Sequence, residues 1–227
     1  FSQDFWPAST VKVLAALAAL DFVRSLGFTG AVEVAFDSGP TDTLRAIVDR
    51  AIRVSSNDDY DLTVLVAGLD RLNEEFLTAA NGFPTTILER SYGAFGVRRS
   101  PALTLTEDPR TERVEARRGR ASYGCPEGGN CADLFELTEA IRRVMLRAEI
   151  SEAERFALDP ADAAALEDAL CNAESSYFLD GARAAFGAEP RICHKTGSVR
   201  DDEALDHGLV EDPATGARYL LAAAIPT

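Results

Sequence analysis

The sequence predicts an α+β fold in which a helical lobe packs on an antiparallel sheet. Two observations carry this prediction. Apolar residues recur at helical spacing over about residues 9–185, and strand-like segments follow one another over about residues 191–227. A chain of 227 residues can form one domain or two closely packed lobes, and we expect a single domain over residues 1–227.

The expected helices follow from the spacing of their apolar residues. Residues 11–26 are apolar on almost every side, which is typical of a helix that is buried all round. The other expected helices are, in chain order, 41–54 with Thr41 or Asp42 as its cap, 60–69, a short helix at 72–80, 133–148, and 161–171 after Pro160.

Alternation of apolar and polar residues predicts the strands. Residues 103–106 and 113–116 form an expected hairpin inside the least regular part of the chain, residues 81–130. The expected terminal sheet contains residues 192–199, 204–210 and 219–225, with a turn at 212–216 before the last strand.

The net charge argues against nucleic acid as a partner, and the hydropathy argues against a membrane span in this chain. The formal net charge is −14, with 37 acidic and 23 basic residues, whereas affinity for nucleic acid rests on lysine and arginine that neutralise phosphates. No stretch reaches the ~20 apolar residues that a membrane span needs. The chain opens at Phe1 without a signal peptide, so we expect a processed form whose export signal has been removed.

The four cysteines predict two disulfides. Cys125 and Cys131 enclose a short loop rich in proline and glycine, which suits a disulfide better than zinc because the two histidines lie far along the chain. Cys171 and Cys193 form the second expected pair, with two reduced thiols as the alternative. An even count favours an oxidising compartment. We expect no metal and no cofactor.

Ser9 and Lys12 form the first candidate site. They lie at positions i and i+3, which places both on one face of a helix. A serine hydroxyl is a poor nucleophile until a base removes its proton, and burial favours the neutral lysine that can do so. The alternative is that Lys12 extends to the surface from an otherwise apolar helix.

A second polar cluster, Ser55-Ser56-Asn57, lies in a break between two expected helices. Ser55 is a candidate to relay a proton between Lys12 and a leaving group, and Asn57 to donate to a substrate carbonyl. The alternative is an ordinary helix cap, since serine and asparagine are favoured there. The triplet at residues 91–93 is set aside, because its third residue has no side-chain amide.

The third cluster begins the terminal sheet. A cationic Lys195 with the Thr196 hydroxyl makes a pocket for a carboxylate, and Gly197 lets a substrate lie against the strand. The backbone N–H groups of Ser9 and Ser198 would then form an oxyanion hole.

These three clusters, in this order, resemble the S-x-x-K, S-x-N and K-T-G motifs of the class A β-lactamases and the wider penicillin-recognising serine enzymes. The resemblance is specific at residues 6–14, 53–57 and 192–198. It implies a β-lactamase/transpeptidase-like fold with the site at the junction of the helical lobe and the sheet. Family members are exported, so it also implies an extracellular or periplasmic protein. The family's sheet includes strands before the nucleophile helix, which we expect to be missing here because only eight residues precede Ser9.

The predicted function is that of a serine hydrolase that forms an acyl-enzyme at Ser9, with β-lactamase-type hydrolysis of a β-lactam. One alternative is a D-alanyl-D-alanine peptidase or esterase, and another is a β-lactam-binding or sensor domain without turnover. The small-molecule partner is accordingly a β-lactam or a D-Ala peptide or ester.

Two departures from the class A pattern concern the acyl-enzyme. Ser56 stands where those enzymes usually have aspartate, and no Glu-x-x-x-Asn segment is present. Glu127 comes nearest, with Asn130 three residues later, and is the candidate deacylation base. We therefore expect slow deacylation.

Overall fold

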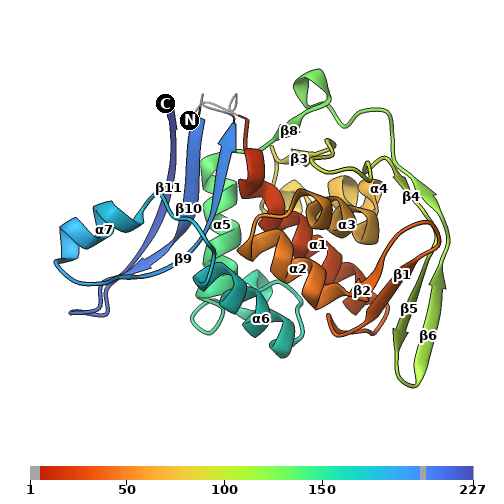
Figure 1. The fold of residues 1–227 in the computed structure, drawn as a ribbon, viewed down its shortest axis with the longest axis horizontal. Coiled ribbons are helices and arrows are strands. Elements are labelled where there is room, and N and C mark those ends of the chain that lie inside the picture. The colour runs from red at the N-terminus through yellow and green to blue at the C-terminus, as the bar shows by residue number, and fades with distance from the viewer. Residues whose placement is uncertain (1–5, 200–202, 227) are drawn as a thin grey trace.

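A computed structural model describes residues 6–199 and 203–226 of the protein. A three-stranded sheet lies at one end, helices fill the middle, and a four-stranded sheet lies at the other end (Figure 1). This arrangement confirms the predicted α+β class. The expectation about strands before Ser9 falls partly on residues 1–5, which lie outside the described residues.

The helical part of the fold is built around α1. Eleven of its residues are buried, including Lys12, as expected for a segment that is apolar on every side. The helices are η1 (Ala8–Val11), α1 (Lys12–Ser25), α2 (Leu44–Arg53), α3 (Asn57–Ala67), α4 (Leu69–Arg71), η2 (Leu72–Phe76), η3 (Ala79–Asn81), η4 (Pro126–Gly128), α5 (Leu134–Met145), η5 (Glu152–Glu154), α6 (Pro160–Cys171) and α7 (Leu179–Phe186).

Two sheets account for most of the strand residues. The terminal sheet has the order β11-β10-β9 and the distal sheet the order β2-β1-β5-β6, all antiparallel. The strands are β1 (Glu33–Phe36), β2 (Thr41–Thr43), β3 (Ile87–Leu88), β4 (Arg99–Ser100), β5 (Leu103–Glu107), β6 (Arg110–Val114), β7 (Arg117–Arg118), β8 (Asn130–Cys131), β9 (Arg191–Val199), β10 (Glu203–Glu211) and β11 (Arg218–Pro226).

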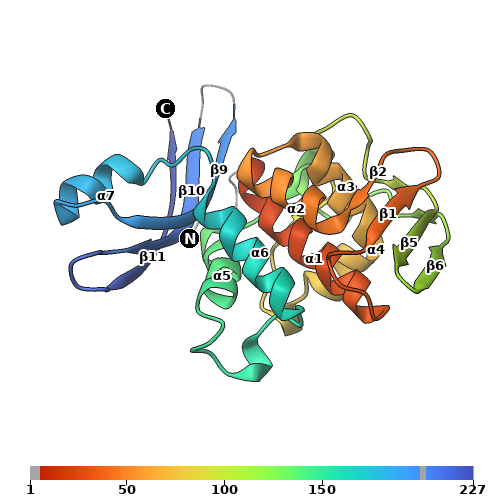
Figure 2. The same ribbon diagram turned by 60° about the horizontal axis from the view of Figure 1, so that its bottom comes forward.

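The junction between helices and terminal sheet brings η1 onto strand β9. Helix α5 packs against β10 and β11, and α6 packs against β9. Helix α7 lies on the opposite side of this sheet (Figure 2). Because η1 carries Ser9 and β9 carries Lys195, the packing of these two elements decides where the candidate residues meet.

Two helix starts differ from the sequence prediction, and side-chain caps explain both. Thr43 caps α2 in place of the expected Thr41 or Asp42, which lie in β2. Ser56 caps α3 by accepting a hydrogen bond from the Asp59 amide at 3.2 Å. Each capping oxygen satisfies an amide that the first helical turn leaves without a partner. The alternative given for the second polar cluster, an ordinary helix cap, is therefore confirmed for Ser56.

The structure contains elements that the sequence pattern did not indicate. The predicted hairpin is present as β5 and β6, but it also pairs with β1, so the helical lobe carries a sheet of its own. Strand β1 has four residues and β2 has three, too short for alternation to be recognised. Helix α7 was also missed.

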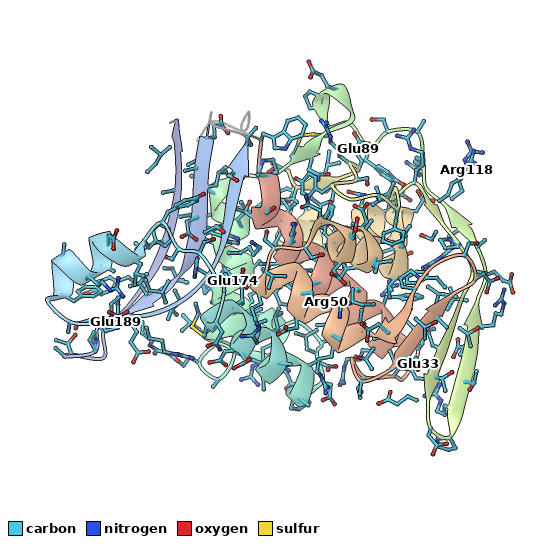
Figure 3. All side chains as sticks on the ribbon, in the orientation of Figure 1. Glu33, Arg50, Glu89, Arg118, Glu174 and Glu189 are labelled. Atoms are coloured by element: carbon cyan, nitrogen blue, oxygen red, sulfur yellow. A yellow bond between two sulfur atoms is a disulfide. The ribbon has the colours of Figure 1, made fainter. Side chains whose placement is uncertain are left out.

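Both expected disulfides are present. Cys125–Cys131 closes the loop that contains η4, and Cys171–Cys193 joins the end of α6 to β9. The second bond lies between the helical lobe and the terminal sheet (Figure 3). It therefore ties together the two parts whose junction holds the candidate residues.

We expect the Cys171–Cys193 bond to contribute more stability than the Cys125–Cys131 bond. The bonds close loops with sequence separations of 22 and 6 residues, and longer loops lose more entropy in the unfolded chain. The loop-entropy relation gives about 3 kcal/mol for the longer loop and about 2 kcal/mol for the shorter. Urea unfolding of the two double alanine variants measures the difference. A larger loss for the Cys125→Ala/Cys131→Ala variant would contradict this expectation.

Candidate active site

Ser9 lies on the short turn that leads into the buried helix α1. The carbonyl of Pro7 accepts a hydrogen bond from the Thr10 amide at 3.1 Å, which closes this turn. Ala8 has a φ of 46°, in the left-handed region that non-glycine residues rarely adopt. Ser9 borders a cavity of about 480 Å³ together with Asn57 and Ser198. The predicted nucleophile is thus held on a strained turn at the wall of a cavity.

Lys12 is fully buried one turn below Ser9. Its Nζ donates to the carbonyl of Ser55 at 2.5 Å and to Asn57 Oδ1 at 2.7 Å. Burial, followed by the charge of Lys195, lowers the pKa of Lys12 to about 7, against the opposing charges of Asp61 and Asp59. The alternative that Lys12 extends to the surface is therefore wrong. Its Nζ faces the second polar cluster, and the Ser9 hydroxyl forms no hydrogen bond with another described residue.

Ser55 joins the two buried lysines. Its Oγ accepts a hydrogen bond from Lys195 Nζ at 2.9 Å and lies 3.3 Å from Lys12 Nζ. Its φ is 56°, again in the left-handed region. Side chains from α1, from the loop before α3 and from β9 thus converge on one hydroxyl, as a proton relay requires.

Lys195 is 1% exposed, and its Nζ also donates to the carbonyl of Thr196 at 2.9 Å. Burial lowers the pKa of Lys195 to about 8, while the charge of Asp206 acts in the opposite direction. The pKa of Lys12 therefore lies below that of Lys195. Near neutral pH this order favours one neutral and one charged lysine.

Strand β9 turns alternate residues toward the nucleophile. Lys195 and Gly197 share one face, whereas Thr196 lies on the other, where its hydroxyl is 3.2 Å from Ser175 Oγ. None of Lys195, Thr196 and Gly197 is among the residues that border the described cavity, which Ser198 does border. A Cβ on Gly197 would come within 3.0 Å of the Ser9 amide nitrogen. The glycine thus makes room for the protein's own nucleophile turn.

Two residues that the sequence reasoning missed, one buried and one partly buried, hold this turn. His207 on β10 contacts the carbonyls of Thr10 and Leu137 through its two ring nitrogens, at 3.2 and 3.0 Å. Burial lowers the pKa of His207 to about 4, so the neutral ring donates to one of them. Tyr92 donates its hydroxyl to the carbonyl of Ala8 at 2.7 Å. No motif or periodicity in the sequence pointed to His207, and Tyr92 lies in the triplet that the sequence analysis set aside.

The segment at residues 91–93, set aside in the sequence analysis, forms part of the cavity wall. Ser91 and Tyr92 border the cavity, and both donate hydrogen bonds to Asp61, which does not border it. Asp61 is fully buried on α3, one turn after Asn57, and accepts hydrogen bonds from Ser91 Oγ at 2.5 Å and from the amide of Tyr92 at 2.9 Å. The sequence offered only the four-residue spacing from Asn57 as a signal.

The carboxylates that the structure describes lie outside the lining of the cavity that Ser9 borders. Glu127 lies exposed on η4 and outside the lining of the cavity. Glu89 is buried, and its carboxylate accepts from the Tyr123 amide at 2.6 Å (Figure 3). Among residues 6–199 and 203–226, no aspartate or glutamate borders the cavity, and no group of three or more potential ligands is placed to bind a metal.

Comparison with solved structures identifies the fold. A class A β-lactamase from Mycobacterium abscessus superimposes with a TM-score of 0.64 at 18% identity, over 98% of this chain and 76% of that one. A β-lactamase from Xanthomonas campestris gives 0.67 at 17% identity, over 98% and 75%. An ancestral class A β-lactamase gives 0.66 at 19%, over 100% and 79%. The chain has the fold of a class A β-lactamase.

The comparisons with sequences return nothing further. No protein-family model matches the chain, and no curated protein matches it. At these identities the likeness concerns the β-lactamase fold alone. None of the helices in the described ranges is both long and apolar enough to cross a membrane.

We expect Gly197→Ala to lower the free energy of unfolding by about 1–3 kcal/mol, because the added methyl group presses on the Ser9 turn. Gly181 on α7 offers a matched control, since a Cβ there meets nothing within 4 Å. Gly181→Ala should be neutral or stabilising by about 0.5–1 kcal/mol. Urea unfolding of both variants measures this, and equal effects would show that the close approach at Gly197 is harmless.

Proposed function

We propose that the protein is a serine hydrolase of the β-lactamase type that forms an acyl-enzyme at Ser9. The observation that carries the proposal is the convergence of Lys12 and Lys195 on Ser55, beside a cavity that Ser9 and Asn57 border. Buried lysines with lowered pKa values are expensive to maintain, and such groups cluster at functional sites. The β-lactamase fold supports the same assignment.

In the proposed first step, the Ser9 oxygen attacks the substrate carbonyl and its proton passes to neutral Lys12. The backbone N–H groups of Ser9 and Ser198, which both border the cavity, stabilise the developing oxyanion. Ser55 then carries a proton to the leaving nitrogen or oxygen as the acyl bond breaks. Hydrogen bonds of this kind are often long before substrate binds, which fits the absence of a direct contact between Ser9 and Lys12.

The proposed substrate is a small molecule with a reactive acyl group and a carboxylate. Charged Lys195 attracts the carboxylate, and Asn57 donates its side-chain N–H to an amide carbonyl, as its Oδ1 is held by Lys12. A β-lactam meets these requirements. A D-Ala peptide or ester also meets them, and a D-alanyl-D-alanine peptidase or esterase is the second candidate. The Thr196 hydroxyl is the least supported part of this pocket, because Ser175 already occupies it.

Hydrolysis of the acyl-enzyme is proposed to be slow. No carboxylate among the described residues borders the cavity, so Lys12 would serve both steps. If the acyl-enzyme is not hydrolysed at all, the same acylation chemistry makes the protein a β-lactam-binding or sensor domain without turnover. The two disulfides favour an extracellular or periplasmic location for such a protein.

We expect Ser9 to be the residue that benzylpenicillin modifies. Intact-mass analysis should show one adduct, and peptide mapping should place it on Ser9. The adduct should disappear in Ser9→Ala but persist in Ser25→Ala, which removes a serine from the other end of α1. An adduct on another residue, or one that survives Ser9→Ala, would contradict the proposal. A panel of other β-lactams and thioesters then ranks the candidate substrates.

Acylation should depend on pH in a bell shape. The rate should rise as Lys12 loses its proton near pH 7 and fall as Lys195 loses its charge near pH 8, so the optimum lies between the two values. In Lys195→Met the rising limb should move to higher pH, because the positive charge that lowers the pKa of Lys12 is gone. The second-order rate of adduct formation measures this. A flat profile across that range would exclude Lys12 as the base.

A further inference from the structure

Tyr92 separates Lys12 from the cavity. Its ring centroid lies 5.9 Å from Lys12 Nζ, and its side chain borders the cavity that Ser9 also borders. Its hydroxyl is tied to the carbonyl of Ala8, the residue before Ser9. Burial raises the pKa of Tyr92 to about 12, so the hydroxyl keeps its proton and remains a donor. An aromatic ring thus stands beside Lys12, the base of the proposed mechanism.

Three contacts fix the ring in this position. Tyr92 stacks on Tyr60 with ring centroids 4.7 Å apart and an interplanar angle of 28°. The amides of Tyr92 and Gly93 donate to Asp61 at 2.9 and 3.1 Å. Asp61 is fully buried, and its carboxylate oxygens accept these two hydrogen bonds and a third from Ser91 Oγ. The hydrogen bonds to Asp61 hold the backbone that carries the ring, and turning the ring itself aside would break the Tyr60 stack and the hydroxyl contact with Ala8.

If Lys12 activates the water that hydrolyses an ester at Ser9, that water must come within reach of Lys12, beside which this ring lies. The water oxygen bonds to the ester carbon, its proton passes to the neutral amine of Lys12, the bond from that carbon to Ser9 Oγ breaks, and the serine oxygen takes a proton back. The acid leaves with the oxygen of water. Because the water must touch both the ester carbon and Lys12, a group that fills the space beside Lys12 blocks the step.

We propose that Tyr92 is a positioning residue that excludes water from Lys12 and so prolongs the life of the acyl-enzyme. This inference rests on the proposed function and adds to it a structural cause for slow deacylation. It also predicts that the two chemical steps respond differently to substitution. Acylation needs no water, whereas deacylation needs an open path for water to the ester and to Lys12.

The test compares the acylation rate and the adduct lifetime for benzylpenicillin in three proteins, by intact-mass analysis over time. Tyr92→Ala opens the space beside Lys12 and should shorten the lifetime about tenfold or more, with a smaller change in acylation. Tyr92→Phe keeps the ring and should retain the lifetime of the unchanged protein. Equal lifetimes in all three proteins would overturn the proposal. Equally short lifetimes in both variants would also overturn it, because the hydroxyl contact with Ala8 would then be the cause.

Further measurements keep the result interpretable. Thermal unfolding shows whether Tyr92→Ala folds, and Tyr92→Leu, which keeps more apolar volume, replaces it if it does not. A shorter lifetime in Tyr92→Leu than in Tyr92→Phe supports the proposal, and equal lifetimes refute it. If the unchanged protein forms no adduct at Ser9, the proposed function fails and this inference fails with it. If an adduct forms at Ser9 and its lifetime is the same in the unchanged protein and in the variants of Tyr92, this inference is refuted and the proposed function stands.

Discussion

The site depends on the burial of two lysine amines within reach of one serine hydroxyl. Lys12 and Lys195 come from elements at opposite ends of the chain, and Ser55 comes from a loop between two helices. An isolated buried ammonium is very unfavourable, so each amine is supplied with oxygen acceptors. The φ of Ser55 lies in the left-handed region, and in this conformation its carbonyl accepts from Lys12 and its hydroxyl lies within reach of both lysines. Any rearrangement of one partner leaves a buried polar group unsatisfied.

The same constraint sets the dependence of stability on pH. Burial lowers the pKa values of the two lysines to about 7 and about 8 from 10.5, so above pH 7 the unfolded chain binds more protons than the folded one. The free energy of unfolding contributed by these groups therefore rises with pH up to about 10.5, and their charged forms destabilise the fold at lower pH. The packing of α5, α6 and η1 on the terminal sheet and the Cys171–Cys193 bond hold the lobe and sheet together against this cost.

Local spacing was sufficient to select Ser9 and Lys12 as candidate residues, and tertiary contacts determine the rest of the candidate site. Ser9 and Lys12 share a helix face, and long segments with strong periodicity became α1, α5 and the terminal sheet. Asp61 and Tyr92 are separated by 31 positions across the irregular part of the chain, so no period links them. The contact of His207 with Thr10 spans 197 positions. Such residues cannot be recognised from the spacing of their neighbours in the sequence, because they stabilise contacts between segments that are far apart along the chain.

The slow hydrolysis proposed for the acyl-enzyme is attributed to the cavity wall and not to the fold. The chain shares the β-lactamase fold with the solved structures compared at 17–19% identity. A search of the sequence for a base favoured Glu127 because of the nearby Asn130, yet the carboxylate that acts on Lys12 most strongly is Asp61. Asp61 is bound to the backbone at residues 92 and 93. Asp61 is fully buried and outside the lining of the cavity, so it is not placed to activate water there. It binds the backbone that carries the Tyr92 ring, and the proposed exclusion of water by that ring would slow hydrolysis of the acyl-enzyme without removing any group proposed for its formation.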